Sequence, residues 1–373
     1  YVIFGEKMKV LILGFSKIKY MPYLNFYLGN MSATKNDIHL IYWNRDLKPE
    51  DTSFLKGITL HEFNYYQEDD APKFKKIKSF INYRKFVLEV LNQNNFDFII
   101  ALHTLPGVLV VDKLKKYFSE KYIFDYRDYT YEYFYPFKKI VHDLVNHSYV
   151  TFVSSDAFRM YLPNTNKILT SHNLLLDSLS HRNEKEKFGI SSNKIRISFW
   201  GFIRNEECNN EIIKKIAADN RFELHYYGRE QQVAKNLKKF VQENNFQNVF
   251  FHGEYKPEDR YKFVRQTDII HNIYCDKNMM LAMSNKYYDG VIFRIPQICM
   301  TGSHMAKKVS NAKIGLACNP YNDDFTEQIY QYYKSINTQV FYKNCDIELQ
   351  RINNEYCSVS EMIKNIFCAE QVQ

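Results

Sequence analysis

Short apolar runs alternate with longer amphipathic segments along the first half of the chain. Short runs rich in Val, Ile, Leu and aromatic residues predict buried strands, and the longer segments between them predict helices. The predicted strands are 9–14, 37–43, 58–63, 96–102, 122–125, 149–154 and 167–170. The predicted helices are 72–92, 106–118 and 133–146. This alternation predicts an α/β fold with a doubly wound parallel sheet.

The alternation restarts after a polar segment near the middle of the chain. Residues 178–193 are polar and charged and show no apolar period, so they predict a linker. Further apolar runs predict the strands 195–200, 223–227, 249–251, 269–273 and 297–300, with helices between them. A chain of 373 residues suits two domains of roughly 150–200 residues. We therefore expect an N-terminal Rossmann-like domain at 8–177, a C-terminal one at 194–354 and a final helix within 355–373.

The composition and the N-terminal segment indicate the class of protein and its compartment, but not the reaction. Hydrophobic residues make up 45% of the chain and charged residues 25%, so the balance is that of a globular protein. No apolar run approaches the ~18 residues of a membrane span. The segment after Met8 leads directly into a strand, so it does not match a signal peptide. We interpret Met8 as a natural start, residues 1–7 as an upstream extension, and the chain as cytoplasmic.

All seven cysteines lie in the C-terminal half of the chain. They are Cys208, Cys275, Cys299, Cys318, Cys345, Cys357 and Cys368. None forms a CxxC pair or a cluster with metal-ligand spacing. The sequence therefore predicts free thiols in a reducing compartment.

A net charge of +8 calls for an anionic partner or a solvated basic surface. Basic residues concentrate in one amphipathic segment, where they are interleaved with apolar ones: Lys73, Lys75, Lys76, Lys78, Arg84 and Lys85 with Phe74, Ile77, Phe80, Ile81 and Val87. Such a helix is typical of segments that rest on anionic lipid, and a second patch follows at 133–139. The alternative is a solvated helix face whose apolar side lies in the core. No nucleic-acid motif is recognised, so we expect no nucleic-acid partner.

The most informative segment for chemistry is a polar turn that leads into a predicted helix. It reads Ser284-Asn285-Lys286-Tyr287-Tyr288-Asp289. A helix N-terminus offers unpaired N–H groups and partial positive charge to a phosphate. Lys286 adds a full positive charge, and Asp289 is placed to accept hydrogen bonds from a ribose diol. The segment therefore predicts a site for a nucleotide diphosphate, with a capped and solvated surface helix as the alternative.

This segment resembles the nucleotide-sugar site of GT-B glycosyltransferases, in particular bacterial family-4-like enzymes. Many of these carry a Pro-Asn-Lys-Leu-Tyr-Glu-Tyr type run before a Gly-x-Pro, and an acidic residue before the proline holds the donor ribose. Asp289 has the matching position before Pro296. Leu281 stands where retaining members often have a second glutamate, and Arg294 stands where the family usually has glycine. The resemblance implies two Rossmann-like domains facing across a cleft, with the C-terminal helix crossing back to the N-terminal domain.

Other strand ends of the predicted C-terminal domain supply further donor-binding candidates. Gly201 follows a buried strand, which lets a ligand approach the backbone, and Arg204 can clamp a diphosphate. A surface arginine at a domain edge is the alternative for Arg204. Arg229 follows the next strand, and Gly253 and Tyr255 follow a later one. The resemblance implies that this later loop contacts the nucleotide base.

Strand ends of the predicted N-terminal domain supply candidates for the acceptor side. His103 resembles the histidine that many GT-B enzymes place near the donor sugar, where it can bind a hydroxyl or act as a base. Asp128 is the first choice of general base, with Asp125 as the other carboxylate, and Arg127 is interpreted as acceptor-binding. A charged turn with internal salt bridges is the alternative. The Gly14 turn lines the same cleft in this class.

We interpret the chain as a glycosyltransferase that moves a sugar from a nucleotide-diphosphate donor, with UDP as the expected nucleotide. The acceptor is a glycan or lipid-linked glycan of bacterial capsule, exopolysaccharide or O-antigen synthesis, at the inner face of the plasma membrane. There is no full GxGxxG pattern and no Asp-x-Asp run, so we expect neither a nicotinamide cofactor nor a metal. Leu281 favours inversion. A nucleotide-sugar epimerase and a non-catalytic pseudo-glycosyltransferase co-subunit are the alternatives.

Overall fold

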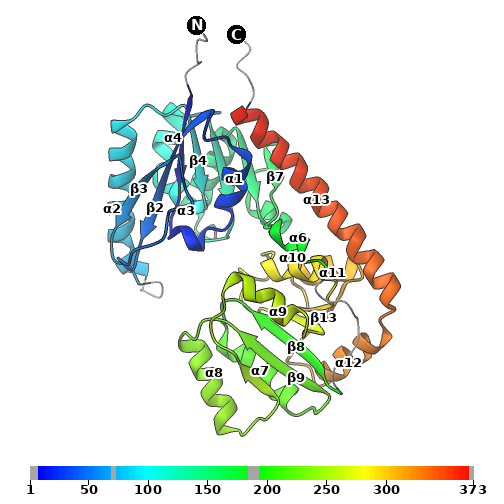
Figure 1. Cartoon of the computed structure of the whole chain (residues 1–373). Helices are drawn as coiled ribbons and strands as arrows, with labels where there is room; N and C mark the ends of the chain where they lie inside the picture. The colour runs from blue at the N-terminus through cyan, green and yellow to red at the C-terminus, as the bar shows by residue number, and fades with distance from the viewer. Residues whose placement is uncertain (1–6, 69–72, 184–192, 369–373) are drawn as a thin grey trace. The chain divides into compact units, whose positions relative to one another are not determined.

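The chain divides into two units, each built around one parallel sheet (Figure 1). A computed structural model describes residues 7–68, 73–183 and 193–368. Unit 1 contains Tyr1–His172 and Glu355–Gln373, and unit 2 contains Asn173–Asn354. The described part of each unit has its own buried apolar core.

Unit 1 has a seven-stranded sheet in the order β3-β2-β1-β4-β5-β6-β7. Its strands are β1 Met8–Leu13, β2 Asn36–Asn44, β3 Ile58–Asn64, β4 Phe98–Leu102, β5 Tyr122–Tyr126, β6 Val150–Val153 and β7 Ile168–Thr170. Its helices are α1 Leu24–Asn30, α2 Lys73–Gln93, α3 Thr104–Leu109, α4 Val111–Tyr117 and α5 Tyr135–His147, with 3-10 turns η1 Ile18–Tyr20 and η2 Asp156–Tyr161. The strand pairings are parallel, which explains the near-continuous apolar runs of the central strands.

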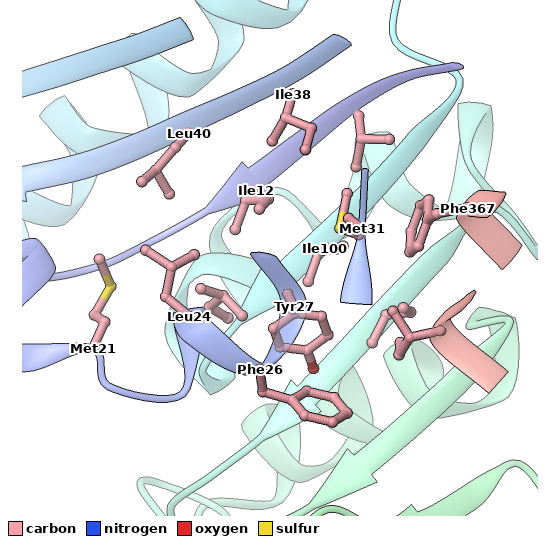
Figure 2. Packing of buried hydrophobic residues seen from close by; sticks show 14 of the residues in the cluster. Ile12, Met21, Leu24, Phe26, Tyr27, Met31, Ile38, Leu40, Ile100 and Phe367 are labelled. Atoms are coloured by element: carbon pink, nitrogen blue, oxygen red, sulfur yellow. The ribbon is translucent and has the colours of Figure 1, made fainter. Parts of the chain in front are cut away.

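Side chains of the central strands form the middle of the unit 1 core. Figure 2 shows Ile12 of β1 and Ile100 of β4 near Tyr27 of α1, and all three are fully buried. Phe367, near the end of α13 (Thr338–Cys368), belongs to the same cluster, and Asn36 Nδ2 donates to the Phe367 carbonyl oxygen at 3.0 Å. The predicted return of the C-terminal helix to the N-terminal domain is therefore confirmed.

Unit 2 has a six-stranded parallel sheet in the order β10-β9-β8-β11-β12-β13. Its strands are β8 Ile195–Trp200, β9 Phe222–Tyr227, β10 Val249–Phe251, β11 Ile269–Asn272, β12 Gln297–Met300 and β13 Gly315–Cys318. Its helices are α6 Asp177–Ser180, α7 Glu206–Ala217, α8 Gln232–Glu243, α9 Arg260–Val264, α10 Asn285–Ile292, α11 His304–Asn311, α12 Phe325–Ser335 and the first part of α13, with the 3-10 turn η3 Pro257–Asp259. The predicted α/β class with two Rossmann-like sheets is confirmed.

Some elements of the structure differ from the prediction. The helix predicted at 106–118 is divided into α3 and α4 at Val110, whose φ of −123° and ψ of 22° leave the helical region. Strand β13 was not predicted because its run of small residues gives no clear strand pattern. The last helix begins at Thr338 instead of residue 355. Its earlier part has a helical period of buried side chains, which are Phe341, Cys345, Leu349 and Ile352.

The boundary between the units lies after His172, before the predicted domain end at residue 177. Two contacts explain why the start of the predicted linker belongs to unit 2. Arg260 donates from its NH2 nitrogen to Ser178 Oγ at 2.6 Å, and the His181 ring stacks on Tyr261 with centroids 3.6 Å apart. The rest of the predicted linker lies largely outside the described residues, as does most of the predicted upstream extension.

The prediction of seven free thiols is wrong for one pair. Cys208 in α7 and Cys275, which follows β11, form a disulfide. The two residues are 67 positions apart in sequence, but the sheet order brings their Cα atoms to 6.2 Å, within the range that a disulfide spans. The free cysteines of the described residues are Cys299, Cys318, Cys345, Cys357 and Cys368.

The predicted basic amphipathic segment forms α2 of unit 1. Ile77 and Ile81, one turn apart, are 58% and 51% exposed, and Lys78 and Lys85 are exposed beside them. Its buried side includes Tyr83 and other core residues. Among the helices that the structure describes, none has the combination of length and apolar character required to cross a bilayer.

Candidate functional site

The polar turn before α10 forms the N-terminal end of that helix, as the sequence predicted. Ser284 precedes the helix, its side chain accepts no hydrogen bond from the first turn, and its hydroxyl donates to Asn272 Oδ1 at 2.7 Å. Asn285 is exposed at the first helical position. The first N–H groups of α10 therefore have no side-chain cap from Ser284, which leaves them suited to an anionic ligand.

Lys286 is a buried ammonium group with few partners. The residue is 5% exposed, and its Nζ donates to the Tyr274 hydroxyl at 2.5 Å and lies 4.1 Å from the Phe199 ring centroid. No carboxylate within the described ranges forms an ion pair with it. A buried charge is costly unless it is paired, and an ammonium has three donors to satisfy. An anionic ligand could therefore pair with the Lys286 ammonium.

Asp289 lies one turn further along the same face of α10 and is 3% exposed. Its Oδ2 accepts a hydrogen bond from Trp200 Nε1 at 2.8 Å, and its Oδ1 lies 3.7 Å from the NH1 nitrogen of Arg260. Burial raises the pKa of Asp289, and the charge of Arg260, the indole hydrogen bond and the charge of Lys286 oppose that rise. The carboxylate is therefore held in one orientation by groups from β8 and α9.

Three glycines bring the strand ends of unit 2 close together. The Gly201 nitrogen donates to the Tyr227 carbonyl oxygen at 2.9 Å, and the Gly228 nitrogen donates to the Gly253 carbonyl oxygen at 2.8 Å. A Cβ at Gly228 would lie 2.1 Å from the Gly201 oxygen, so only glycine fits there. Gly201 has a φ of +125°, and a Cβ on it would lie 3.8 Å from Lys286 Nζ. The loop after β8 therefore passes directly beside the buried ammonium.

The other predicted donor-binding residues lie on loops of the same unit. Arg204 is half-buried with its guanidinium 4.8 Å from the Phe202 ring, and it forms no ion pair with any described residue. Arg229 is exposed after β9. Tyr255 packs edge-on against Phe263 with centroids 5.1 Å apart, and burial raises its pKa to about 12. The structure thus leaves Arg204 available to a ligand and holds the Tyr255 ring on an aromatic neighbour.

Three residues of this site were missed by sequence reasoning. Trp200 donates to Asp289, Arg260 faces the same carboxylate, and Tyr274 accepts from Lys286. Trp200 ends β8 and Tyr274 lies two residues after the end of β11, near the edge where ligands of open α/β sheets bind, and that position was an available signal. Arg260 had no such signal, because it begins the short helix α9.

In unit 1, His103 and Asp128 form a hydrogen-bonded pair. His103 Nε2 lies 2.7 Å from Asp128 Oδ2, and since a carboxylate only accepts, Nε2 carries the proton. His103 has a φ of +85°, which is rare for a residue with a side chain and marks strained sites of functional interest. Thr104 Oγ1 also donates to the Asp128 carbonyl oxygen at 3.1 Å. The Asp128 side chain is 46% exposed against 23% for His103, so Asp128 is the member that a substrate reaches more readily.

Asp125 and Arg127 are turned inward, and the structure does not support the roles predicted for them. The Asp125 carboxylate is fully buried, lies 2.6 Å from Arg127 Nε, and accepts from the Tyr27 hydroxyl at 2.8 Å. Arg127 is 5% exposed and also donates to the Ser171 carbonyl oxygen at 3.2 Å. This is the internal salt bridge that stood as the alternative reading. Neither residue presents its charge to an acceptor.

Gly14 has a packing role in unit 1. A Cβ there would lie 2.7 Å from the Ile41 carbonyl oxygen and 2.8 Å from the Met21 side chain. Its own carbonyl oxygen accepts from the Tyr83 hydroxyl at 2.7 Å. These contacts explain the glycine without any acceptor. Within the described ranges, no group of three or more His, Cys, Asp or Glu side chains is arranged to hold a metal ion.

Comparison with known proteins shows similarity in structure and not in sequence. No protein-family model and no curated protein matches the chain. Sucrose-phosphate synthase from Thermosynechococcus elongatus is 11% identical, with a TM-score of 0.73 over 98% of this chain and 100% of that chain. Anabaena HepE in complex with UDP and glucose is 12% identical, with a TM-score of 0.67 over 95% of this chain and 99% of that one.

The same fold also occurs in a protein of another enzyme class. A protein from Listeria monocytogenes assigned as a UDP-N-acetylglucosamine 2-epimerase is 9% identical, with a TM-score of 0.55 over 91% of each chain. At these identities the likeness shows the fold alone. The chain therefore has the two Rossmann-like units of the GT-B fold, and its chemistry must be argued from the site.

Proposed function

We propose that the chain is a glycosyltransferase whose unit 2 binds a UDP-sugar. The observation that carries the proposal is the incomplete pairing of two buried, oppositely charged groups on one face of α10. Lys286 Nζ has one hydrogen bond and no carboxylate partner among the described residues, and Asp289 Oδ1 has no hydrogen bond among them. A ligand that completes both must offer anionic oxygens and a hydroxyl donor together, which a nucleoside diphosphate does.

The same groups suit the chemistry of sugar transfer. Displacement at the anomeric carbon releases a nucleoside diphosphate, so negative charge grows on the phosphate oxygens in the transition state. The ammonium of Lys286, the guanidinium of Arg204 and the N-terminus of α10 are fixed donors that stabilise this charge. We propose that they do so without a metal. The similarity to HepE, whose structure holds UDP and glucose, supports UDP as the nucleotide.

Unit 1 carries the group proposed to activate the acceptor. The Asp128 carboxylate is half-exposed at the end of β5, and the hydrogen bond from His103 fixes its orientation. An acceptor hydroxyl has a high pKa, so an inverting transfer needs a positioned base. We propose Asp128 as that base and His103 as the residue that positions it. Leu281, which replaces the second glutamate of the retaining pattern, is consistent with inversion.

A lipid-linked acceptor fits two exposed surfaces of unit 1. Ile77 and Ile81 of α2 project beside exposed lysines, and Tyr133, Phe134 and Tyr135 are 66%, 59% and 76% exposed ahead of Lys138 and Lys139. Aromatic and aliphatic side chains among lysines match the headgroup region of an anionic membrane. We propose that the acceptor is a glycan on such a lipid, built at the inner face of a bacterial plasma membrane.

Two measurements test the proposal: nucleotide binding to the full chain and identification of the reaction products. UDP should raise the midpoint of thermal unfolding of the full chain more than ADP or pyrophosphate does, since ligands that bind only the folded state stabilise it. With a UDP-sugar and an acceptor, the products should be free UDP and a glycosylated acceptor. The epimerase alternative predicts a UDP-sugar of changed configuration and no free UDP. A chain that binds no nucleotide would support the pseudo-glycosyltransferase alternative and overturn the proposal.

A further inference from the structure

We propose that the Cys208–Cys275 disulfide is a redox switch that sets how tightly unit 2 binds the diphosphate of a nucleotide. The inference rests on the nucleotide-sugar site proposed above, and it adds a means of regulating that site. With the disulfide formed, the segment after β11 is fixed and the Lys286 ammonium is held in place for a diphosphate. Reduction releases the segment and weakens diphosphate binding.

The disulfide joins two segments that each lead to a predicted diphosphate-binding residue. Cys275 directly follows Tyr274, whose hydroxyl oxygen accepts from Lys286 Nζ at 2.5 Å. Cys208 lies in the first turn of α7, four residues after Arg204 in the loop before that helix. The disulfide therefore ties the loop that carries Arg204 to the segment that holds Lys286.

A hydrogen bond accompanies the disulfide between the same two segments. Asn205 Nδ2 donates to Asp276 Oδ2 at 2.8 Å, and Asp276 directly follows Cys275 in the chain. Both side chains of this hydrogen bond belong to half-buried residues, so water can replace either partner. The covalent bond, in contrast, persists until it is reduced. The disulfide is therefore the link between the two segments that a change of redox state removes.

The Tyr274 hydroxyl fixes the position of the Lys286 ammonium. Lys286 Nζ also lies 4.1 Å from the Phe199 ring centroid and 5.1 Å from the Tyr274 ring centroid. The two rings meet edge to face with their centroids 6.2 Å apart. Because a lysine side chain is flexible, its ammonium keeps one position only while its neighbours hold it. Movement of the segment after β11 removes both the hydroxyl and one of the two rings.

The two sulfurs differ in exposure, which sets the order of thiol–disulfide exchange. Cys208 is 2% exposed and Cys275 is half-buried, so the thiolate of a dithiol reductant reaches the Cys275 sulfur. Its attack forms a mixed disulfide with Cys275 and expels Cys208 as a thiolate, which takes up a proton. The second thiol of the reductant then attacks the reductant sulfur of the mixed disulfide and expels Cys275. The protein gains two thiols, and the reductant becomes a disulfide.

The test measures the binding of UDP and of uridine to the full chain by titration calorimetry, after equilibration with reduced or oxidised dithiothreitol. Thiol titration of the unfolded chain should find five free thiols after oxidation and seven after reduction. Reduction should weaken UDP binding about 5-fold or more and leave uridine binding within about 2-fold. Uridine has no diphosphate, so a general loosening of unit 2 would weaken both ligands alike, whereas the switch changes the ratio of their Kd values.

The possible failures are distinguishable. The same UDP affinity in both redox states, or an equal loss for UDP and uridine, would overturn the switch while the donor proposal stands. A thiol count that does not change between the two treatments would show that the bond is not exchanged and would also overturn the switch. Absence of UDP binding in both states would overturn the donor proposal and the switch together.

Variants make the test independent of the reagents. Cys275→Ser removes the disulfide, so its ratio of UDP and uridine Kd values should match that of the reduced wild type in both treatments. Cys357→Ser, which removes an exposed free thiol of unit 1, is the matched control and should respond as the wild type does. If Cys275→Ser does not fold, Tyr274→Phe keeps the disulfide and removes the hydroxyl, so UDP should bind weakly in both redox states. A redox response of wild-type size in Tyr274→Phe would overturn the proposed route through Tyr274.

Discussion

Arg294 and Asp346 form a two-pronged ion pair in unit 2, with Arg294 Nε at 3.1 Å and NH2 at 3.0 Å from Asp346 Oδ1. Arg294 has a φ of +54°, a left-handed conformation that glycine adopts without strain. Arg294 stands where the resembled pattern usually has glycine, and in this chain its side chain forms the ion pair with Asp346. The ion pair fastens the segment after α10 to α13.

Replacing Arg294 should separate the cost of its backbone conformation from the value of its ion pair. Arg294→Gly relieves the left-handed strain and loses the ion pair, and we expect unfolding free energy to change by less than about 1 kcal/mol. Arg294→Ala loses the ion pair and keeps the strain, so it should be less stable than Arg294→Gly by about 1 kcal/mol. Urea unfolding of the two variants measures the difference. Equal stability would show that this position is not strained.

The ionisation of Asp289 should give nucleoside binding a pH dependence. Burial raises the pKa of Asp289, while Arg260, Trp200 and Lys286 oppose the rise, and the charge of Asp289 in turn raises the pKa of Tyr255. Protonation removes the charge that strengthens the bond from a ribose hydroxyl. Uridine affinity should therefore fall as pH drops through the raised pKa, at a higher pH than an ordinary aspartate would give.

Arg260→Gln is the variant that tests this dependence. Loss of the cation raises the pKa of Asp289 further, so the fall in uridine affinity should move to higher pH. Uridine is the suitable ligand because it has no phosphate that titrates in this range. Folding stability should depend on pH in the opposite direction to uridine binding. Between the pKa of Asp289 in the unfolded chain and its raised pKa in the folded chain, only the folded chain is protonated at Asp289. The free energy of unfolding should therefore fall as pH rises through this range. Identical pH profiles of uridine affinity for Arg260→Gln and the wild type would contradict an electrostatic interaction between Arg260 and Asp289.

Turnover should depend on Asp128 more than on His103. Asp128→Asn removes the proposed base and should lower kcat by about 10²–10⁴-fold with little change in UDP affinity. His103→Gln keeps a donor near Asp128 and should have a smaller effect. Asp112→Asn, an exposed aspartate of the same unit, is the control. Near-normal transfer by Asp128→Asn, or retention of anomeric configuration in the product, would remove Asp128 from the mechanism.

The exposed isoleucines of α2 should contribute to membrane binding. The double substitution Ile77→Ser and Ile81→Ser removes apolar surface that is solvated in the free protein, so it should weaken sedimentation with anionic vesicles and leave stability nearly unchanged. Ile347→Ser is the matched control, because Ile347 is 57% exposed in unit 2. Equal vesicle binding by the double variant and the wild type would exclude α2 as the docking surface.

The fold and part of the site could be predicted from the sequence. Features made by residues close together in sequence were predicted, and contacts between residues far apart in sequence were missed. Lys286 and Asp289 were found because a helix start and its first turn are local in sequence. Trp200 was not connected to Asp289, because the two are 89 positions apart and only the sheet order brings them together. Cys208 and Cys275 were missed for the same reason.

Sequence reasoning ranked Asp128 ahead of Asp125 as the base, but it did not show that the Asp125 side chain is buried. Asp125 and Asp128 stand three positions apart in one charged turn. The difference lies in side-chain direction: Asp125 is the last-but-one residue of β5 and points into the core, where Arg127 neutralises it. Asp128 lies beyond the strand and meets His103. Such directions depend on packing, which no local pattern reports.

The binding of UDP and of uridine to Lys286→Met tests the central claim most directly. Methionine keeps much of the apolar stem and removes the charge, so the loss should fall on the diphosphate and not on the nucleoside. We expect UDP to bind about 10- to 100-fold more weakly, as for the loss of a charge-assisted contact, and uridine to bind as it does to the wild type. Lys262→Met, which changes an exposed lysine of unit 2, should leave both affinities unchanged. Unaltered UDP affinity in Lys286→Met would contradict the account.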